Sequence, residues 1–318
     1  MTTPLLRIGT RGSPLALIQA ETVRDRLAAA HPELRAPGAI AIVPIRTTGD
    51  SVRDRTLAAI GGKGLFTKEI EEALLSDAID LAVHSLKDMA TLLPEGLAIV
   101  CHLPRADPRD AFISSSVARL LDLPPGAIVG SSALRRQAQL LRARPDLRVV
   151  PIRGNVETRL RKIEEGKADA TLLAVAGLDR MGMQSRITEI LPTDLMLPAP
   201  AQGIIAVEAR VSDQRALRYV APLDDAATSA RAAAERALLA ALDGSCRTPI
   251  AALAEIDAEG RLTLQARIIR PDGTRCHEAA RSGAAVDAAR LGHDAGAALR
   301  AEAGPGFFDL PIPEGTPV

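Results

Sequence analysis

The stretch richest in chemically capable side chains follows a short apolar run near residue 80. Residues 79–83 are apolar except for one aspartate, which is typical of a strand buried on both faces. His84, Ser85, Lys87 and Asp88 come directly after it. In an open parallel sheet, ligands collect where the chain leaves the carboxyl end of a strand. A carboxylate beside a lysine there can be a tuned acid or base, or a solvated ion pair, and spacing alone leaves both open.

Arginines recur at three predicted strand-to-helix junctions. They are Arg11 before the helix cap Ser13, Arg135 and Arg136 after Ser131 and Ser132, and Arg153 and Arg159 around the cap Asn155. A helix N-terminus offers free N–H groups, and a guanidinium adds a fork that suits carboxylate or phosphate. One such arginine is usually a solvated surface residue. Three junctions facing one cleft would indicate a ligand with several anionic groups.

The three cysteines lie far apart, which argues against a disulfide framework. Cys246 falls in a loop between a helix end and a strand, where Arg247 would favour the thiolate and the helix C-terminus would oppose it. Cys101 lies in an apolar run and is predicted to fill a core. Cys276 is predicted to be an ordinary strand residue.

The elements that must position these residues alternate between strand and helix. We predict a mostly parallel sheet from strands 5–9, 40–45 and 79–83, with helices starting at Pro14 and near Thr67. The pattern restarts after residues 104–108, with strands 127–130, 147–152 and 170–175 and helices 134–143 and 156–165. A late strand, 204–209, could rejoin the first sheet. Such a chain would cross twice between two lobes, and a cleft between lobes is a common ligand site.

The last hundred residues have a different pattern. An alanine-rich helix at 229–242 precedes strands 250–256, 262–269 and 275–281, of which the last two are joined by a Pro-Asp-Gly-Thr turn, and a final helix at 286–301. We therefore predict an α/β chain of two lobes plus a small α+β domain. The predicted boundaries are 1–103 plus 204–222 for the first lobe, 104–203 for the arginine-rich second lobe, and 223–318 for the C-terminal domain.

Composition narrows the possible partners. The 318 residues contain 39 basic and 39 acidic side chains, so no overall field favours DNA or an anionic membrane. Residues 131–167 are basic, with 10 basic against 4 acidic residues, which leaves RNA binding open. Aromatics make up only 2%, however, so stacking platforms for bases are scarce. The chain shows no signal peptide and no apolar run of about 20 residues, so we expect a cytoplasmic protein without a membrane partner.

Several familiar motifs are missing from the sequence. Gly62-Lys63-Gly64 lacks the rest of a phosphate-binding loop, there is no Gly-x-Ser-x-Gly elbow, and the five histidines show no metal-ligand spacing. These absences argue against nucleotide hydrolysis, serine hydrolysis and a zinc site.

Taken together and in order, the motifs resemble the porphobilinogen deaminase (hydroxymethylbilane synthase) family over nearly the full chain. The matching segments are residues 10–16 (TRGSPLA), 61–66 (GGKGLF), 82–88 (AVHSLKD), 107–112 (DPRDAF), 132–136 (SALRR), 153–159 (RGNVETR), 173–178 (LAVAGL), 202–203 (QG) and 244–249 (GSCRTP). Each is weak alone. One departure is Ala90, where proline is common in the family; it removes no functional group.

The resemblance implies two lobes like those of a periplasmic binding protein and a third domain that carries a cofactor cysteine. Cys246 would hold a dipyrromethane primer through a thioether, and Asp88 would be the catalytic carboxylate with Lys87 beside it. Cofactor contacts would come from Lys87, Ser131, Ser132, Arg135 and Arg136, and substrate contacts from Arg11, Ser13, Phe66, Arg153, Arg159, Arg180 and Gln202. The expected protein is a monomer that binds no nucleic acid.

The implied reaction joins four porphobilinogen molecules on the primer with loss of ammonia, and releases hydroxymethylbilane for haem and other tetrapyrroles. Two of six pyrrole rings would be retained. No metal is called for. The alternative is a cytoplasmic two-lobed anion-binding or sensor module, which would explain the arginines but would leave Cys246 and Asp88 without roles. Finally, residues 46–64 are polar and hold four glycines, and we predict that they form a mobile cover over the cleft.

Overall fold

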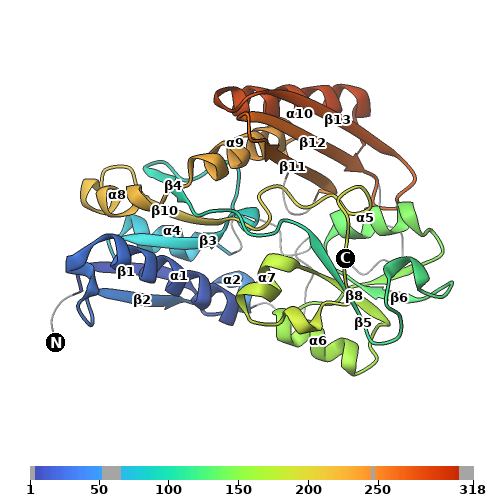
Figure 1. The fold of residues 1–318 in the computed structure, drawn as a ribbon, viewed down its shortest axis with the longest axis horizontal. Coiled ribbons are helices and arrows are strands. Elements are labelled where there is room, and N and C mark those ends of the chain that lie inside the picture. The colour runs from blue at the N-terminus through green and yellow to red at the C-terminus, as the bar shows by residue number, and fades with distance from the viewer. Residues whose placement is uncertain (1–3, 52–65, 245–247, 308–318) are drawn as a thin grey trace. The chain divides into compact units, whose positions relative to one another are not determined.

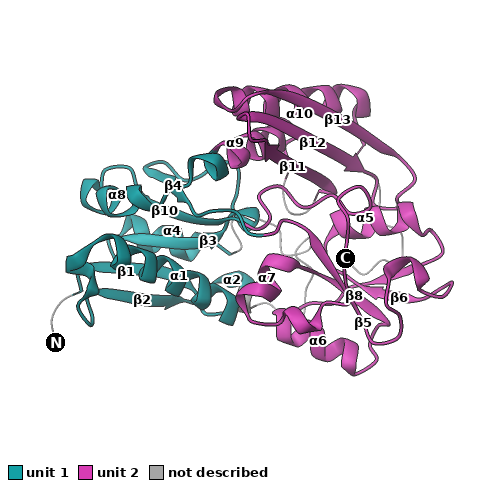
Figure 2. Ribbon diagram, in the orientation of Figure 1, with its two compact units in different colours: residues 1–52, 62–106, 204–229 teal, residues 53–61, 107–203, 230–318 magenta. Residues whose placement is uncertain are grey.

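The computed structural model describes residues 4–51, 66–244 and 248–307. The predicted cover and the Cys246 loop therefore lie almost entirely outside the described residues. Of the predicted cover, the described part contains a one-turn helix, α2 (Thr48–Ser51), where the sequence suggested only loop. The chain divides into two compact units, residues 1–52, 62–106 and 204–229 in one, and residues 53–61, 107–203 and 230–318 in the other (Figure 2).

The first unit is built on a five-stranded sheet of order β2-β1-β3-β10-β4 (Figure 1). Its strands are β1 (Leu6–Arg11), β2 (Ile40–Ile45), β3 (Leu81–Ser85), β4 (Leu97–His102) and β10 (Ile205–Arg210). β1 runs parallel to β2 and β3, whereas β10 runs antiparallel to β3 and β4. The late strand thus rejoins the first sheet, as predicted, and makes that sheet mixed.

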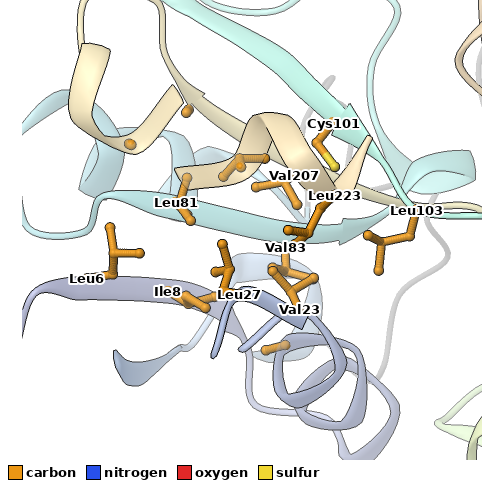
Figure 3. Close-up of a cluster of buried hydrophobic side chains, with 14 of the residues drawn as sticks. Leu6, Ile8, Val23, Leu27, Leu81, Val83, Cys101, Leu103, Val207 and Leu223 are labelled. Atoms are coloured by element: carbon orange, nitrogen blue, oxygen red, sulfur yellow. The ribbon is translucent and has the colours of Figure 1, made fainter. Parts of the chain in front are cut away.

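Helices cover both faces of this sheet. On one face, α1 (Pro14–Ala30) buries Val23 and Leu27 against Ile8 and Val83, with α8 (Gln214–Val220) packed on the same cluster (Figure 3). On the other, α4 (Lys68–Leu75) buries its predicted stripe of Ile70 and Leu74. Fully burying such a side chain is worth about 1.5–3 kcal/mol, so these two apolar faces hold the strand ends in place.

The second unit repeats this topology with different strands. Its sheet has the order β7-β6-β8-β5-β9, formed by β5 (Asp110–Ser114), β6 (Ile128–Gly130), β7 (Arg148–Val150), β8 (Ala170–Ala174) and β9 (Glu189–Ile190). Again three strands are parallel and the fourth in spatial order, β5, is antiparallel to both neighbours. The helices of this sheet are α5 (Leu134–Ala143), α6 (Val156–Glu164) and α7 (Val175–Arg180).

The C-terminal part of the second unit carries a separate antiparallel sheet, β11-β12-β13. Its elements are α9 (Ala226–Ala241), β11 (Ile250–Ile256), β12 (Arg261–Ile269), β13 (Cys276–Ala284) and α10 (Ala288–Ala303). Helices α9 and α10 pack on one sheet face through an alanine- and leucine-rich core. On the sheet, Arg267 Nη1 donates to Gln139 Oε1 of α5 (3.0 Å), which ties this sheet to the arginine-bearing helix.

The predicted fold class, two α/β lobes with a small α+β C-terminal domain, is confirmed. Each lobe sheet is mixed, with one strand reversed. Short 3-10 turns complete the described chain at η1 (Pro32–Arg35), η2 (Leu86–Asp88), η3 (Leu120–Asp122), η4 (Gln184–Arg186), η5 (Ala221–Leu223) and η6 (Ala285–Asp287). Among the described helices, none combines the length and apolar character needed to cross a bilayer.

Candidate functional site

A pocket opens at the carboxyl edge of the first sheet. It contains about 450 Å³ of empty space, part of it open to solvent. Its lining comes from the ends of β1 and β3, the first turns of α1, η2 and the start of α4. The lining residues are Arg11, Ser13, Leu15, Ala16, Gln19, Phe66, Thr67, Val83, His84, Ser85 and Asp88.

Arg11, Ser13 and Phe66, three predicted substrate-binding residues, meet in this pocket. Ser13 caps α1 as predicted, with its hydroxyl accepting from Ala16 N at 3.4 Å, and Pro14 occupies the first turn. The guanidinium carbon of Arg11 lies 4.2 Å from the centre of the Phe66 ring, a cation–π contact that orients the arginine.

Asp88 and Lys87 lie on η2, directly after β3. This turn is anchored because Leu86 is buried and its N–H donates to Ile204 O of the same unit (3.0 Å). Asp88 lines the pocket with an exposed side chain, and it forms no salt bridge with any residue the structure describes. Lys87 is half-buried and is not among the lining residues. An exposed carboxylate on an anchored turn is positioned to act on a ligand.

Two further polar side chains of the pocket had no assigned role in the sequence analysis. Gln19 of α1 donates to Ser85 Oγ at the end of β3 (2.9 Å), which links the helix to the strand inside the pocket. His84 lies beside Ser85 and bonds to a buried glutamate of β10. The sequence signalled His84, which directly follows the predicted strand 79–83 and lies within β3 in the structure; Gln19, on α1, had no such signal.

In the second unit, the carboxyl edge of the sheet is occupied by a buried ionic cluster. Asp110, at the start of β5, is fully buried and accepts from Arg135 Nη1 (2.7 Å) and Arg136 Nη2 (2.6 Å). The two guanidiniums also donate to the carbonyls of Leu197 and Leu172, respectively. Arg135 and Arg136 were both expected to contact the cofactor. Here both also meet one carboxylate of the protein itself.

The charges in this cluster determine the protonation of Asp110. Burial by itself would raise the pKa of the Asp110 carboxyl, but the positive charges of Arg135 and Arg136 outweigh it and hold that pKa well below its usual range. Two arginines and one carboxylate leave a net positive charge in the interior. That surplus would favour an anionic group of a ligand at this edge.

Gln202 and Arg180 adjoin the cluster. Gln202 is buried, and its Nε2 donates to Pro108 O (2.7 Å) and Asp110 Oδ1 (3.1 Å). Arg180 Nη2 donates to Gly203 O (2.6 Å). Burial lowers the pKa of Arg180 to about 10, and the nearby Asp179 opposes the shift only in part. A cation desolvated in this way would gain from an anionic ligand.

Ser131, Ser132, Arg153 and Arg159 follow the ends of β6 and β7. Ser131 Oγ accepts from Ala133 N (3.2 Å), and Ser132 Oγ donates to Ile152 O (3.1 Å), so both hydroxyls also shape the turns. Arg159 Nε donates to Gly154 O (2.9 Å) behind the predicted cap Asn155, whose side chain accepts from Thr158 N (2.9 Å). Burial lowers the pKa of Arg153. These residues share one sheet edge with Arg180 and the Asp110 cluster.

Of the three cysteines, Cys246 lies outside the described residues. Cys101 is fully buried, and burial raises the pKa of its thiol to about 12, in agreement with its predicted role in the core. Cys276 is half-buried at the start of β13, as predicted for a strand residue, and burial raises the pKa of its thiol. Neither thiol is set up as a nucleophile.

The sequence analysis gave no role to Asp110 or to Glu208. Both stand in strands that are otherwise mostly apolar, and both are fully buried. A lone carboxylate in an apolar strand must be paired or protonated, so the signal was present in the sequence. The sequence did not identify the partners of Asp110, because Arg135 and Arg136 are 25 and 26 residues away from it.

Two family models together match most of the chain. A family model described as "Porphobilinogen deaminase, dipyromethane cofactor binding domain" matches residues 6–218, and "Porphobilinogen deaminase, C-terminal domain" matches residues 229–301. The chain belongs to the porphobilinogen deaminase family. This membership confirms the resemblance and gives no support to the anion-binding or sensor alternative.

Curated relatives agree over almost the whole chain. The porphobilinogen deaminase of Nitrobacter hamburgensis is 56% identical over 306 residues, covering 96% of each chain. The chloroplastic porphobilinogen deaminase of Oryza sativa is 53% identical over 308 residues, covering 96% of this chain and 86% of its own. Among solved structures, a periplasmic substrate-binding protein from Coxiella burnetii covers 73% of this chain and 96% of its own, at 15% identity and a TM-score of 0.44.

Proposed function

We propose that this protein condenses four porphobilinogen molecules, with loss of ammonia, and releases hydroxymethylbilane. The observation that carries the proposal is the pocket at the end of β3, where an exposed carboxylate, Asp88, lines the same pocket as Arg11. A porphobilinogen ring carries acetate and propionate arms that suit arginine. Its reacting carbon passes through a cationic state that suits a carboxylate.

Asp88 is the proposed catalytic residue. Loss of ammonia leaves positive charge on the pyrrole ring, and a fixed carboxylate beside the ring nitrogen stabilises that charge. The same carboxylate can take and return the ring N–H proton as each bond forms. Because η2 is anchored by Leu86, Asp88 needs little reorganisation to meet the developing charge.

The arginines of the second unit are the proposed holders of carboxylate arms. The buried surplus of positive charge around Asp110 and the desolvated Arg180 and Arg153 support this role. The hydroxyls of Ser131 and Ser132 lie on the same edge. A dipyrromethane, which carries four carboxylates, matches this set of donors in charge and in chemistry.

We propose that Cys246 holds the dipyrromethane through a thioether. When bound, that group supplies the pyrrole carbon that is extended. Support for this attachment site comes from the other two thiols, whose burial leaves them unsuited to attachment. The family model that names a cofactor-binding domain matches residues 6–218 and supports the cofactor itself. We further propose the three-domain division given above, a monomeric state and a cytoplasmic location. The three separate sheets support that division.

The test measures the intact mass of the purified protein and its consumption of porphobilinogen. Wild-type protein should carry a covalent adduct of two pyrrole units, and Cys246→Ser should lack it. Cys276→Ser is the matched control and should keep it. An adduct that persists on Cys246→Ser would refute the attachment site, and a wild-type protein that does not consume porphobilinogen would refute the proposed activity.

A further inference from the structure

Behind the pocket lies a buried acidic cluster that the proposed function does not use. It consists of His84 at the end of β3, Glu208 of β10 and Glu71 of α4. The His84 and Glu208 side chains are 4% and 0% exposed, and the Glu71 residue is 8% exposed. His84 Nε2 and Glu208 Oε2 are 3.1 Å apart. Three ionisable groups in one apolar interior have a cost in stability, so the cluster calls for an explanation.

The pairing with Glu208 engages one ring nitrogen of His84, Nε2. A carboxylate can only accept, so Nε2 carries the proton that is donated to Glu208. In the tautomer with its proton on Nε2, the ring keeps a lone pair on Nδ1. Within the residues the structure describes, no group donates to Nδ1, and His84 is part of the pocket lining. The pocket lining therefore includes a histidine whose Nε2 is held by a buried carboxyl group and whose Nδ1 has no donor among the described residues.

The second oxygen of Glu208 is also unsatisfied. Glu208 Oε1 is buried and has no hydrogen-bond partner among the described residues. Leaving a buried charged acceptor unpaired costs at least about 1–3 kcal/mol, and such atoms in native structures often mark a site of function. A cation brought to His84 would lower this cost by its charge.

Further charged groups lie around the pair. Burial raises the pKa of Glu71; a hydrogen bond with Thr67 and the charge of His84 oppose the shift, and the charge of Glu208 adds to it. The other charged residues of α4 are Lys68, Glu69 and Glu72, and Glu69 accepts a hydrogen bond from Thr48 N. At the pocket, Arg11 and Asp88 are the charged lining residues. Arg11 stacks on Phe66. The acidic groups at the pocket are therefore Asp88 and the His84–Glu208 pair.

We propose that His84, backed by Glu208, receives the aminomethyl group of porphobilinogen, a role that rests on the proposed function. That group is an ammonium ion at neutral pH, and it donates to His84 Nδ1. The C–N bond then breaks with its electron pair remaining on nitrogen, so ammonia departs and the positive charge stays on the methylene-pyrrole. The ring N–H proton subsequently passes by way of Asp88 to ammonia, which gives ammonium and a neutral methylene-pyrrole.

This arrangement assigns separate tasks to the two acidic groups of the pocket. Asp88 acts on the ring nitrogen, where charge appears, while His84 and Glu208 keep the leaving group protonated and fix the direction of its C–N bond. Only the protonated amine can depart as neutral ammonia. If Glu208 were replaced by an uncharged side chain, the preference for the protonated amine would be lost, but the contacts to the pyrrole ring would stay in place.

The experiment compares two substrates on the holoenzyme: porphobilinogen and its analogue with a hydroxymethyl in place of the aminomethyl group. For Glu208→Gln, we expect kcat/KM to fall about 10–100-fold with porphobilinogen, the scale of one charge-assisted contact, and less than about threefold with the neutral analogue. Glu72→Gln, an exposed charge removal on the neighbouring α4 position, is the matched control and should change neither value.

If Glu208 had a structural role, its replacement would lower kcat/KM for both substrates together. That result in a folded variant would overturn the proposal. Turnover of porphobilinogen by Glu208→Gln at the wild-type rate would overturn the proposal as well. If Glu208→Gln does not fold, judged by circular dichroism, His84→Asn replaces it with the same expected split. Methylammonium should also compete with porphobilinogen in the wild-type enzyme, and absence of competition counts against the site. A wild-type protein inactive on porphobilinogen would instead refute the proposed function.

Discussion

The two lobe sheets share one strand order and differ in how each treats the carboxylate at its carboxyl edge. In the first, Asp88 stands exposed on a turn, with no salt bridge to the described residues. In the second, Asp110 is fully buried between Arg135 and Arg136. Equivalent edges therefore hold an available charge in one lobe and an internally matched charge in the other. The difference shows that a polar residue at a strand end indicates function only when its partners are known.

The largest expected effect is the loss of the matched charge. Asp110→Asn leaves two buried guanidiniums without their counter-ion and should lower the free energy of unfolding by about 3–5 kcal/mol. Urea unfolding followed by circular dichroism measures it. Asp107→Asn, which breaks a half-exposed pair with Arg109, is the control and should cost clearly less. Equal losses would mean that the two edges do not differ in the way described.

Removal of the available charge should affect rate and not stability. Asp88→Asn keeps the shape of the side chain but removes the charge that stabilises a cationic ring, so turnover of porphobilinogen should fall at least about 100-fold. The unfolding midpoint should stay at the wild-type value. Glu95→Gln, another exposed carboxylate outside the pocket, should leave the rate unchanged. Near-normal turnover by Asp88→Asn would make Asp88 an ordinary surface residue.

A third comparison separates arginines inside and outside the buried cluster. Arg180→Lys keeps a charge but loses the guanidinium fork, so KM should rise about tenfold while stability is kept. Arg136→Lys should instead destabilise the protein, because the fork contacts both Asp110 and Leu172 O. Steady-state kinetics and thermal unfolding of both variants give the two readouts. A loss of stability in Arg180→Lys without a change in KM would place it with the structural arginines.

The smallest expected effect is a loss of folding stability at low pH. Because the arginines hold the folded-state pKa of Asp110 below its unfolded value of about 3.9, its stabilising contribution is complete above that value and is lost as the pH falls toward the folded pKa. Between pH 5 and pH 3, wild type should lose roughly 1 kcal/mol that Asp110→Asn does not lose. Urea titrations at both pH values test this, and parallel losses in the two proteins would contradict it.

The sequence by itself determined most of the local structure. Helix α1 begins after its Ser13 cap and ends before Pro32, and α5 spans Leu134–Ala143 as predicted, because capping, proline and apolar periodicity act over a few residues. The strand before Asp88, the hairpin of the C-terminal sheet and the burial of Cys101 followed in the same way. The order of the motifs was sufficient to indicate the family.

Only the tertiary structure decided the partners. The sequence could not show that Asp110 meets Arg135 and Arg136, that His84 meets Glu208 across 124 residues, or that β10 and β5 run against their neighbours. Local propensity has no information about such pairs. Their distance depends on which strands lie side by side, and that is settled by burying both faces of each sheet at once. A carboxylate therefore acquires its role, matched or available, only when the sheet has formed.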